Sequence, residues 1–593
     1  MMGCVSLVRR PWFVLILFGL LIFATRVPLA PGQLFTFDDV NLAYAIGHFD
    51  IRMSQPHPPG YPLFVMEMRV LSWLHFRRAE SILLALALLG SIAAILLLVY
   101  AGNRIFGRDS GFWAACILVL HPVFWHSGVT SALRVQLAVV SLSAGICCWN
   151  AWRGDVRWVT WSALAIGIGA GIRPETGPLL LPLWIACALR APLTWKQRGK
   201  ALGVMTIAVL IWLLPAMFAS GGPLNFIRAN LDYISDQASV SSGVFGATGS
   251  RWRTSVTQLL VWTFCGMLAW PLPAVLAWRR KGGWAVGWER LAFLGLWILP
   301  FLVFSILVHV EDPGHTLAMV PVVSLFGGYL INRALENSDA WVSRLQVPIM
   351  MLATYFMIQI YQRHDEIYLL TWLPVVCIAT ALAFKVAQTP NRKYFPRIFT
   401  IALILFPILQ INYLYFNHHG WYFKGAPTTG IDASLDQAWA DINSAFALTS
   451  IDQIHATLAV DDHTLRETRR LVAERPGKTI VIWERGLAAW RKAAYYSPGV
   501  QVVVLEHKKL RSGSPPVIAI WNGPKLERRL QGTAPLRLDL RPGDRIVWLL
   551  NPRTDFFPLV QQNFPLTQAG PVYSTDLPQE SGSRLLGEYE LVW

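Results

Sequence analysis

The sequence predicts an α-helical polytopic membrane protein of about 13 transmembrane helices with a soluble C-terminal α/β domain. Hydrophobic residues make up 54% of its 593 residues and charged residues only 15%, whereas soluble proteins carry about 25% charged residues. Apolar runs such as 81–100 and 291–308 match the roughly 20 residues that cross a hydrocarbon core. From about residue 417 the charges become mixed and the apolar runs short, so we expect two domains, 1–416 and 417–593.

Hydropathy places the predicted spans one after another along the first domain. A further apolar stretch, 61–74, is only about 14 residues long and contains Glu67 and Arg69. These properties suit a helix at the membrane surface better than a span. We expect the spans at roughly 12–30, 81–101, 110–125, 134–152, 158–172, 176–190, 201–218, 257–278, 291–309, 316–332, 347–362, 367–387 and 397–416.

The positions of Lys and Arg orient these spans. If 61–74 lies on the surface, the basic clusters between spans all fall on one side, which the positive-inside rule assigns to the cytoplasm. The loop 31–80, the loop 220–258 and the C-terminal domain then share the non-cytoplasmic face. The net charge of +16 is therefore a topology signal and does not indicate nucleic-acid binding. The clusters are Arg9/Arg10, Arg104/Arg108, Arg153/Arg157, Arg190 to Lys200, Arg279 to Arg290, Arg333/Arg344 and Lys385 to Arg397.

The C-terminal domain contains short alternating runs that are typical of strands. It has no glycine-rich nucleotide-binding fingerprint, which argues against a nucleotide-linked substrate. The absence of Asn-X-Ser/Thr sequons and of cysteines in the outer loops favours a bacterial inner membrane with this domain in the periplasm. We expect strands at 479–483, 500–505, 517–521 and 545–550, and helices at 461–474 and 490–496.

Two adjacent carboxylates, Asp38 and Asp39, lie in the first outer loop at the start of a predicted short helix. One interpretation is structural, with Asp38 as the N-cap residue and Asn41 at N3, favoured by the helix dipole. The other is catalytic, since a carboxylate in a partly desolvated pocket can act as a general base. The sequence leaves both interpretations open.

Further ionisable residues recur near the outer ends of the predicted helices. His57 lies in a proline-rich stretch, 54–63, which predicts a rigid turn that could hold the imidazole against a phosphate or a metal. Ionisable groups at membrane depth are energetically costly and tend to be functional, although snorkelling to the interface is the structural alternative. The other candidates are His126, Arg134, Arg173, Glu175 and His315.

The pairing of Asp38-Asp39 with His57-Pro58-Pro59-Gly60-Tyr61-Pro62-Leu63 resembles the GT-C superfamily of membrane glycosyltransferases. It is most similar to the protein O-mannosyltransferase-like and DUF2723-type branches. Pro122-Val123-Phe124-Trp125 and Gly171-Ile172-Arg173-Pro174-Glu175 are similar to further landmarks of the family. A surface helix in the first outer loop, about thirteen spans and an outward C-terminal domain also resemble the aminoarabinose-transferase and oligosaccharyltransferase members.

The resemblance implies transfer of a sugar from a polyprenyl-phosphate donor to a lipid, glycan or protein acceptor on the outer face. Asp38 or Asp39 would be the catalytic base, and a single displacement with one base would invert the anomeric carbon. Some members of the family hold a divalent cation, so Mg²⁺ or Mn²⁺ at Asp38 and Asp39 is a further expectation. Residues expected to bind the donor phosphate or substrate are His57, His126, Arg134, Arg173, Glu175 and His315.

Two other classes of protein compete with this interpretation. In a lipid or glycolipid transporter or flippase, the same charges would line a path across the membrane. The sequence shows neither an internal repeat nor paired broken helices, which are typical of transporters. In a non-catalytic membrane scaffold or sensor, the C-terminal domain would be the receptor, and the clustered Asp, His and Arg residues of the outer loops would remain without a role.

Overall fold

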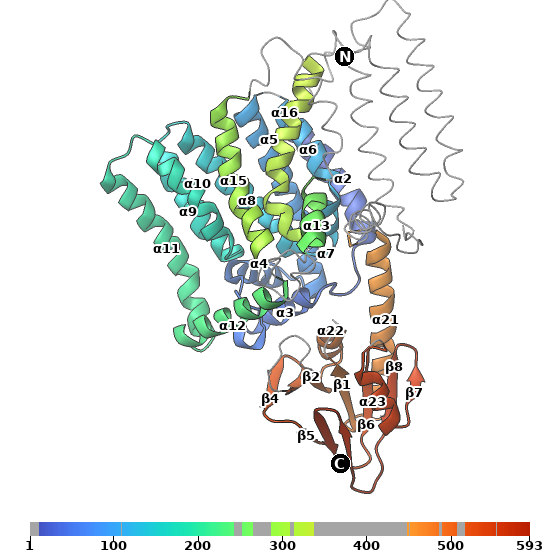
Figure 1. The fold of residues 1–593 in the computed structure, drawn as a ribbon. Coiled ribbons are helices and arrows are strands. Elements are labelled where there is room, and N and C mark those ends of the chain that lie inside the picture. Colours follow the sequence, from blue (N-terminus) through green and yellow to red (C-terminus); the bar gives the residue numbers. More distant parts are fainter. Residues whose placement is uncertain are drawn as a thin grey trace, which may run out of the picture.

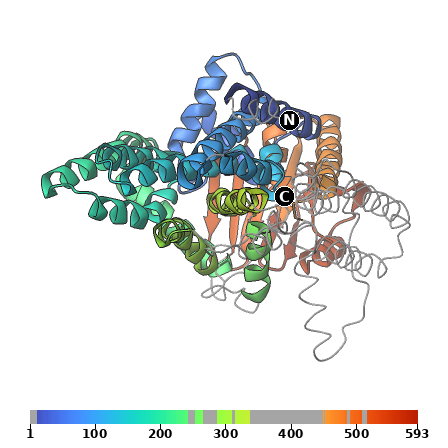
Figure 2. The same ribbon diagram turned by 90° about the horizontal axis from the view of Figure 1, so that it is seen from above.

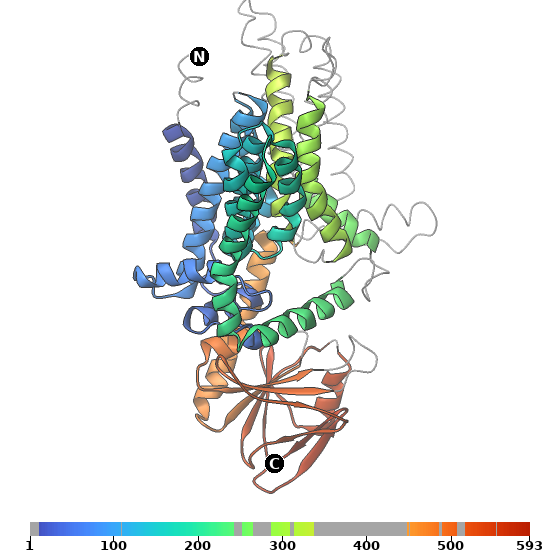
Figure 3. The ribbon, with the colours of Figure 1, turned by 90° about the vertical axis from the view of Figure 1, so that its left-hand side faces the viewer.

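A helical membrane region and a C-terminal domain built on a β-sheet make up the computed structural model of the chain (Figure 1). The helices of the membrane region run side by side, and the C-terminal domain lies at one end of them (Figures 1 and 3). The structure describes residues 11–107, 109–241, 252–264, 286–308, 313–336, 448–449, 451–484, 489–506, 516–552 and 554–593.

Five of the described helices are long and apolar enough to cross a membrane, or six spans if one bent pair is counted as a single span. All five coincide with predicted spans. The predicted spans 347–362, 367–387 and 397–416, and the boundary between the domains at 416/417, lie outside the described residues. The five helices are α2 (Pro11–Arg26), α5 (Ala79–Phe106), α8 (Ala132–Trp152), α11 (Trp195–Ala219) and α15 (Trp288–Leu307).

The predicted span at 110–125 is present as a bent pair of helices. The segment forms two helices, α6 (Ser110–Val119) and α7 (Pro122–Thr130), whose axes differ by 60°. Pro122 occupies the first turn of α7, where its missing N–H costs nothing, whereas inside a continuous helix it would remove a hydrogen bond and clash with the preceding turn. The indole of Trp125 in α7 donates to the carbonyl of Thr25 near the end of α2 (3.3 Å), so α7 is attached to α2.

Shorter helices complete the membrane region. The stretch 61–74 forms α4 (Pro62–Trp73), a helix of 12 residues that is too short to cross a hydrocarbon core. Phe64 and Met68 are buried while Trp73 is exposed, so α4 presents one apolar face to the protein and leaves apolar surface outside. Its position at the membrane surface stays a prediction. The other helices are α9 (Arg157–Ile172), α10 (Thr176–Arg190), α13 (Trp252–Phe264) and α16 (Val320–Glu336).

The polar outer elements gather at the end of the bundle that faces the C-terminal domain (Figure 1). Because α5 and α8 both start at this end, their other ends, near Arg104 and Arg153, lie together at the far end of the bundle, where Arg104 reaches Asn150 (3.4 Å). Arg104 and Arg153 thus lie at the end of the bundle opposite to the loop 31–80. The outer elements are η1 (Val27–Leu29), α3 (Phe37–Gly47), η2 (Ile51–Met53), α12 (Pro223–Ser241) and η5 (Pro313–Ala318).

The C-terminal domain is a mixed sheet of seven strands in the order β4-β3-β2-β1-β6-β8-β7, with a second sheet in the order β5-β10-β9. The central strand β1 is parallel to β2 and β6. The strands and helices are α21 (Ile451–Glu474), β1 (Thr479–Glu484), α22 (Ala489–Tyr496), β2 (Gln501–Glu506), β3 (Val517–Asn522), β4 (Lys525–Gln531), β5 (Leu536–Asp539), β6 (Arg545–Leu549), α23 (Phe556–Asn563), β7 (Thr567–Ala569), β8 (Val572–Asp576), β9 (Ser583–Leu586) and β10 (Tyr589–Val592). The predicted strands and helices of this domain are confirmed.

Both faces of the large sheet are buried, because alternate residues of a strand point to opposite faces. On β1, Val481 and Trp483 pack with α21 and α22, whereas Ile482 packs with α23 and the small sheet. The face that carries α22 is turned towards the membrane region, and α22 packs against α3 (Figure 1). Seen along the bundle in Figure 2, part of the sheet lies directly behind the helices, so the domain covers that end of the bundle.

Glycines allow the membrane helices to approach closely, as is common where helices pack within a membrane. A Cβ atom on Gly111 of α6 would lie 2.1 Å from the carbonyl oxygen of Val99 on α5. A Cβ atom on Gly145 of α8 would lie 2.0 Å from the ring of Trp297 on α15. The α5–α6 and α8–α15 contacts therefore require glycine at these positions.

The substitution Gly111→Ala is expected to destabilise the membrane region by about 1–3 kcal/mol, since α5 and α6 must separate to admit the methyl group. The matched control is Gly203→Ala on α11, where a Cβ atom meets nothing within 4 Å and alanine favours the helix by about 1 kcal/mol. Thermal unfolding in detergent should show a lower midpoint for Gly111→Ala alone. Equal midpoints for the two variants would contradict the described packing of α5 on α6.

Candidate active site

The start of α3 separates the roles of the two adjacent carboxylates. Thr36 is the N-cap residue: the Asp39 N–H donates to Thr36 Oγ1 (3.0 Å), and the Thr36 N–H donates to Asp39 Oδ2 (2.8 Å). This reciprocal pair is a capping box. The expectation of Asp38 as N-cap with Asn41 at N3 is therefore wrong. The N-cap is Thr36, whose hydroxyl accepts the hydrogen bond from the N3 residue, Asp39. Asp39 carries the structural role.

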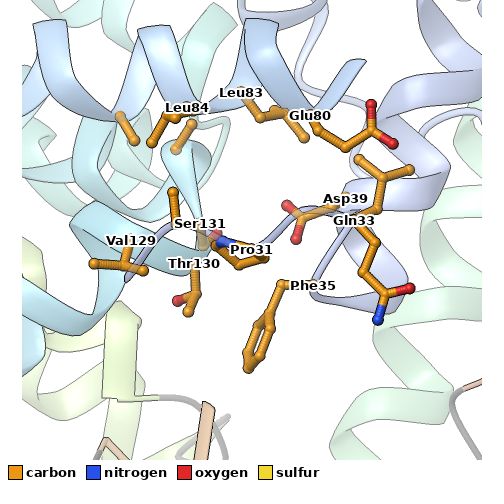
Figure 4. Close-up of a pocket in the computed structure, with 14 residues that line it drawn as sticks. Pro31, Gln33, Phe35, Asp39, Glu80, Leu83, Leu84, Val129, Thr130 and Ser131 are labelled. Carbon is orange, nitrogen blue, oxygen red and sulfur yellow. The ribbon is translucent and has the colours of Figure 1, made fainter. Parts of the chain in front are cut away.

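Asp39 is buried, with 2% of its surface exposed. Burial raises the pKa of its carboxyl to about 6, although the two hydrogen bonds from Thr36 oppose the shift. The side chain lines a small pocket between the first outer loop, the start of α5 and the junction of α7 and α8. Figure 4 shows the Asp39 carboxylate turned into this space, with Leu83 and Leu84 on one side and Phe35 on another.

His126 lies at this pocket. Its Nδ1 is 3.3 Å from the hydroxyl of Thr130, and its ring stands edge-on to the ring of Phe35, with centroids 6.2 Å apart. Thr130 and Phe35 both line the pocket. The sequence predicted His126 as a residue that binds the donor phosphate or substrate. In the structure it lies beside the pocket that Asp39 lines.

Asp38 faces a different set of side chains. Its Oδ1 lies 3.4 Å from His57 Nδ1, and its Oδ2 lies 3.7 Å from Arg134 Nη2. About a third of the Asp38 side chain (33%) is exposed, whereas those of His57 and Arg134 are about 10% exposed or less. Asp38 is thus an accessible carboxylate held between an imidazole and a guanidinium.

Arg134 is positioned by its neighbours on two elements. It lies in the first turn of α8, and its Nη1 is hydrogen-bonded to His315 Nε2 of η5. Gly314 lies so close that a Cβ atom there would stand 2.6 Å from Arg134 Cγ. The absence of a side chain at Gly314 therefore leaves room for the arginine, and η5 holds it beside Asp38.

His57 is buried on the other side of Asp38. Burial lowers the pKa of the imidazole; the neighbouring Asp38 carboxylate opposes this shift, but to a smaller extent. Nε2 lies 3.0 Å from the hydroxyl of Tyr61, and the ring lies 5.9 Å from that of Tyr233 on α12. His57 is therefore a neutral imidazole at pH 7, enclosed by two tyrosines.

Arg173 extends this group of residues. It follows the end of α9, is 1% exposed, forms an ion pair with Glu175 and lies over the ring of Tyr61, 5.3 Å from its centroid. Nε and Nη1 of Arg173 are buried and make no hydrogen bond with any residue that the structure describes. We call Asp38, His57, Tyr61, Arg134, Arg173, Glu175, Tyr233 and His315 the Asp38 cluster.

Two members of the Asp38 cluster have no predicted role. Tyr61 lies inside the proline-rich stretch. Its backbone is left-handed (φ 47°) at the start of α4, a property that the surrounding sequence does not indicate. Tyr233 lies on α12, 176 positions after His57, and nothing in its surrounding sequence indicates a site. Burial raises the pKa of both hydroxyls, that of Tyr233 to about 12, so both tyrosines are neutral donors at pH 7.

The described side chains do not fit the expected Mg²⁺ or Mn²⁺ site. No three His, Cys, Asp or Glu side chains converge anywhere in the ranges that the structure covers. Asp38 and Asp39 face different surroundings, and Asp38 is adjacent to Arg134, whose charge opposes a divalent cation. The metal stays an untested prediction.

No protein-family model matches this sequence, and no curated protein matches it. Among solved structures, ArnT from Cupriavidus metallidurans bound to undecaprenyl phosphate aligns over 97% of this chain and 98% of its own, with 13% identity and a TM-score of 0.52. The chain shares the fold of ArnT. ArnT in the apo state aligns over 95% and 97% at 12% identity, with a TM-score of 0.53. The archaeal oligosaccharyltransferase AglB from Archaeoglobus fulgidus aligns over 68% of this chain and 55% of its own, at 11% identity and a TM-score of 0.34.

The likeness to ArnT shows a shared fold, in which a helical membrane region is followed by a mixed β-sheet domain. It covers nearly the whole length of both chains, so the C-terminal domain belongs to the shared fold. The predicted architecture, a helical membrane region followed by a C-terminal domain with a β-sheet, is thereby confirmed at the level of fold.

The burial of His57 predicts a pH-dependent stability. Because its pKa is lower in the folded protein than in the unfolded chain, where it is about 6.5, the unfolded state takes up the proton first as pH falls. Stability is therefore lost below about pH 6.5. His57→Gln lacks this titrating group, so its stability should fall less than that of the wild type as the pH is lowered. The difference in thermal midpoint between wild type and variant should therefore be smaller at pH 5 than at pH 7.5.

The matched control is His48→Gln, at an exposed histidine just after α3. This variant should follow the wild-type midpoint at each pH. A difference between wild type and His57→Gln that stays constant from pH 7.5 to pH 5 would show that His57 does not titrate differently in the folded state.

Proposed function

We propose that this protein transfers a sugar from a polyprenyl-phosphate donor to a lipid, glycan or protein acceptor on the non-cytoplasmic face of a membrane. The observation that carries the proposal is the position of Asp38, an accessible carboxylate beside His57 and Arg134 that is free of helix capping because Asp39 has that role. The shared fold supports the donor class, since the ArnT structure contains undecaprenyl phosphate.

Asp38 is the proposed base. It would accept the proton of the acceptor hydroxyl as the acceptor oxygen bonds to the anomeric carbon of the sugar. The bond between that carbon and the phosphate oxygen breaks at the same time, and the polyprenyl phosphate leaves. One displacement of this kind inverts the anomeric carbon. The neutral His57 at 3.4 Å orients the carboxylate without competing for its charge.

The leaving phosphate needs cations and hydrogen-bond donors more than it needs an acid, because it already carries negative charge. Arg173 is suited to this role. Its Nε and Nη1 are buried without a hydrogen bond to the described residues, while Glu175 and Tyr61 hold the guanidinium in place. Hydrogen bonds from a guanidinium to phosphate are charge-assisted and strong in such surroundings. Arg134 would supply the second positive charge.

Three finer assignments belong to the same proposal. The likeness of the motif around His57 favours the protein O-mannosyltransferase-like or DUF2723-type branch of the superfamily. The charge pattern and the absence of sequons favour a bacterial inner membrane, with the C-terminal domain in the periplasm. The pocket beside Asp39 and His126 is separate from the proposed phosphate site, and we assign it no role in the reaction.

The experiment compares Asp38→Asn with Asp39→Asn in purified protein supplied with labelled polyprenyl-phosphate sugars and membrane extract as the source of acceptor. Asp38→Asn should lower kcat by about 100-fold or more, since it removes the general base. Asp39→Asn should stay within about tenfold of wild type, because the amide oxygen of asparagine can still accept the Thr36 N–H.

The opposite ranking would make Asp39 the base and contradict the proposed division of roles. No turnover of any donor, together with movement of labelled lipid between leaflets driven by ATP or an ion gradient, would favour a transporter and overturn the proposed function.

A further inference from the structure

One helix of the C-terminal domain, α22, contacts the first outer loop. Arg491 of α22 is 1% exposed, and its Nη2 donates to the carbonyl oxygen of Met53 (3.0 Å) and more weakly to that of Ser54 (3.4 Å). Met53 and Arg491 are 438 positions apart in the sequence. A buried guanidinium therefore joins the C-terminal domain to the backbone of the loop that carries His57.

The rest of the Arg491 side chain is enclosed by aromatic rings. Its guanidinium lies 5.1 Å from the ring centroid of Tyr44 on α3 and 4.4 Å from that of Trp521 on β3. A cation over an aromatic face is attracted by the ring quadrupole, more strongly when water is excluded. Burial lowers the pKa of Arg491 to about 10, so the side chain remains charged at neutral pH. Arg491 thus bridges the two domains as a cation.

The backbone held by Arg491 leads directly to His57. Ser54 has a left-handed conformation (φ 53°), and the loop closes on itself because Asp50 and Gln55 exchange backbone hydrogen bonds (2.7 and 3.1 Å). The side chain of Gln55 donates to the carbonyl oxygen of Pro524, between β3 and β4. The C-terminal domain therefore holds the turn before His57 at two points.

A second contact of α22 lies on the other side of α3. The hydroxyl of Tyr496 accepts a hydrogen bond from the Leu34 N–H (2.8 Å) and donates to Glu80 of α5 (2.6 Å). Leu34 lies two positions before Thr36, the N-cap of α3. The segments before and after α3, the helix that carries Asp38, are both attached to α22.

We propose that α22 positions the active site, with Arg491 and Tyr496 as positioning residues that hold the first outer loop so that His57 and Asp38 keep their geometry. The catalytic part of this inference rests on the proposed function, whereas the attachment of the loop does not. A misplacement of about 1 Å at a reacting group can lower a rate by about 100-fold. The C-terminal domain would then contribute to catalysis without touching the substrate.

The test measures hydrogen exchange and kinetics on the same full-length variants. In Arg491→Ala, deuterium uptake in the segment 50–55 should rise by about tenfold in rate, because the backbone bonds between Asp50 and Gln55 open more often. The matched control is Arg537→Ala on β5, an exposed arginine that pairs with exposed Asp539. This control should leave uptake in 50–55 unchanged.

In the transfer assay, Arg491→Ala should lower kcat by about tenfold or more while the KM for the donor changes less than about threefold. Arg491→Lys, which keeps the charge but not the planar guanidinium, should fall between wild type and Arg491→Ala. If Arg491→Ala does not fold, Tyr496→Phe replaces it as the test variant. Loss of the hydroxyl removes the hydrogen bond from the Leu34 N–H, so deuterium uptake should rise in the segment before α3.

Unchanged uptake in folded Arg491→Ala would overturn the attachment of the loop, even if transfer is confirmed. Raised uptake with unchanged kcat would overturn the positioning role. If the wild type transfers no sugar, the proposed function fails while the uptake measurements still decide whether α22 holds the loop.

Discussion

Successive residues of an α-helix point about 100° apart, so the adjacent Asp38 and Asp39 of α3 cannot share the same surroundings. The hydrogen bonds between Thr36 and Asp39 decide which carboxylate turns inward. Asp39 is committed to the helix start, and Asp38 is left to face His57 and Arg134. The charge arrangement beside His57 and Arg134 follows from this assignment, because Asp38 is the carboxylate that remains accessible there.

Two buried cations at this end, Arg173 and Arg491, have specific partners. Removing a charge from water is costly unless a counter-charge or a polar environment compensates it. Arg173 has Glu175 and the face of Tyr61, and Arg491 has two carbonyl oxygens and the rings of Tyr44 and Trp521. Partners of this kind hold a guanidinium in a defined orientation, which suits the proposed role of presenting positive charge to a phosphate.

Several particulars of the site were predictable from the sequence, and others were not. Arg134 and Arg173 could be found because they are ionisable residues near the ends of apolar runs, where such residues are rare. Asp38 and His57 could be found because an acidic pair and a proline-rich stretch stand out in the first outer loop. The choice between Asp38 and Asp39 depended on the Thr36 side chain, which the pattern did not single out. The bend within the predicted span at 110–125 was not predictable, because hydropathy does not report the break that Pro122 introduces.

The sequence by itself predicted a membrane protein, the five spans that the structure describes, four strands of the C-terminal domain and a short list of candidate site residues. These are local properties, since hydropathy, periodicity and residue type act over a few turns of chain. Only the tertiary structure decided which side chains meet. Tyr233 reaches His57, His315 reaches Arg134, and Arg491 reaches Met53 across long separations in the chain. Such contacts arise from the packing of whole helices and domains, which no short stretch of sequence encodes.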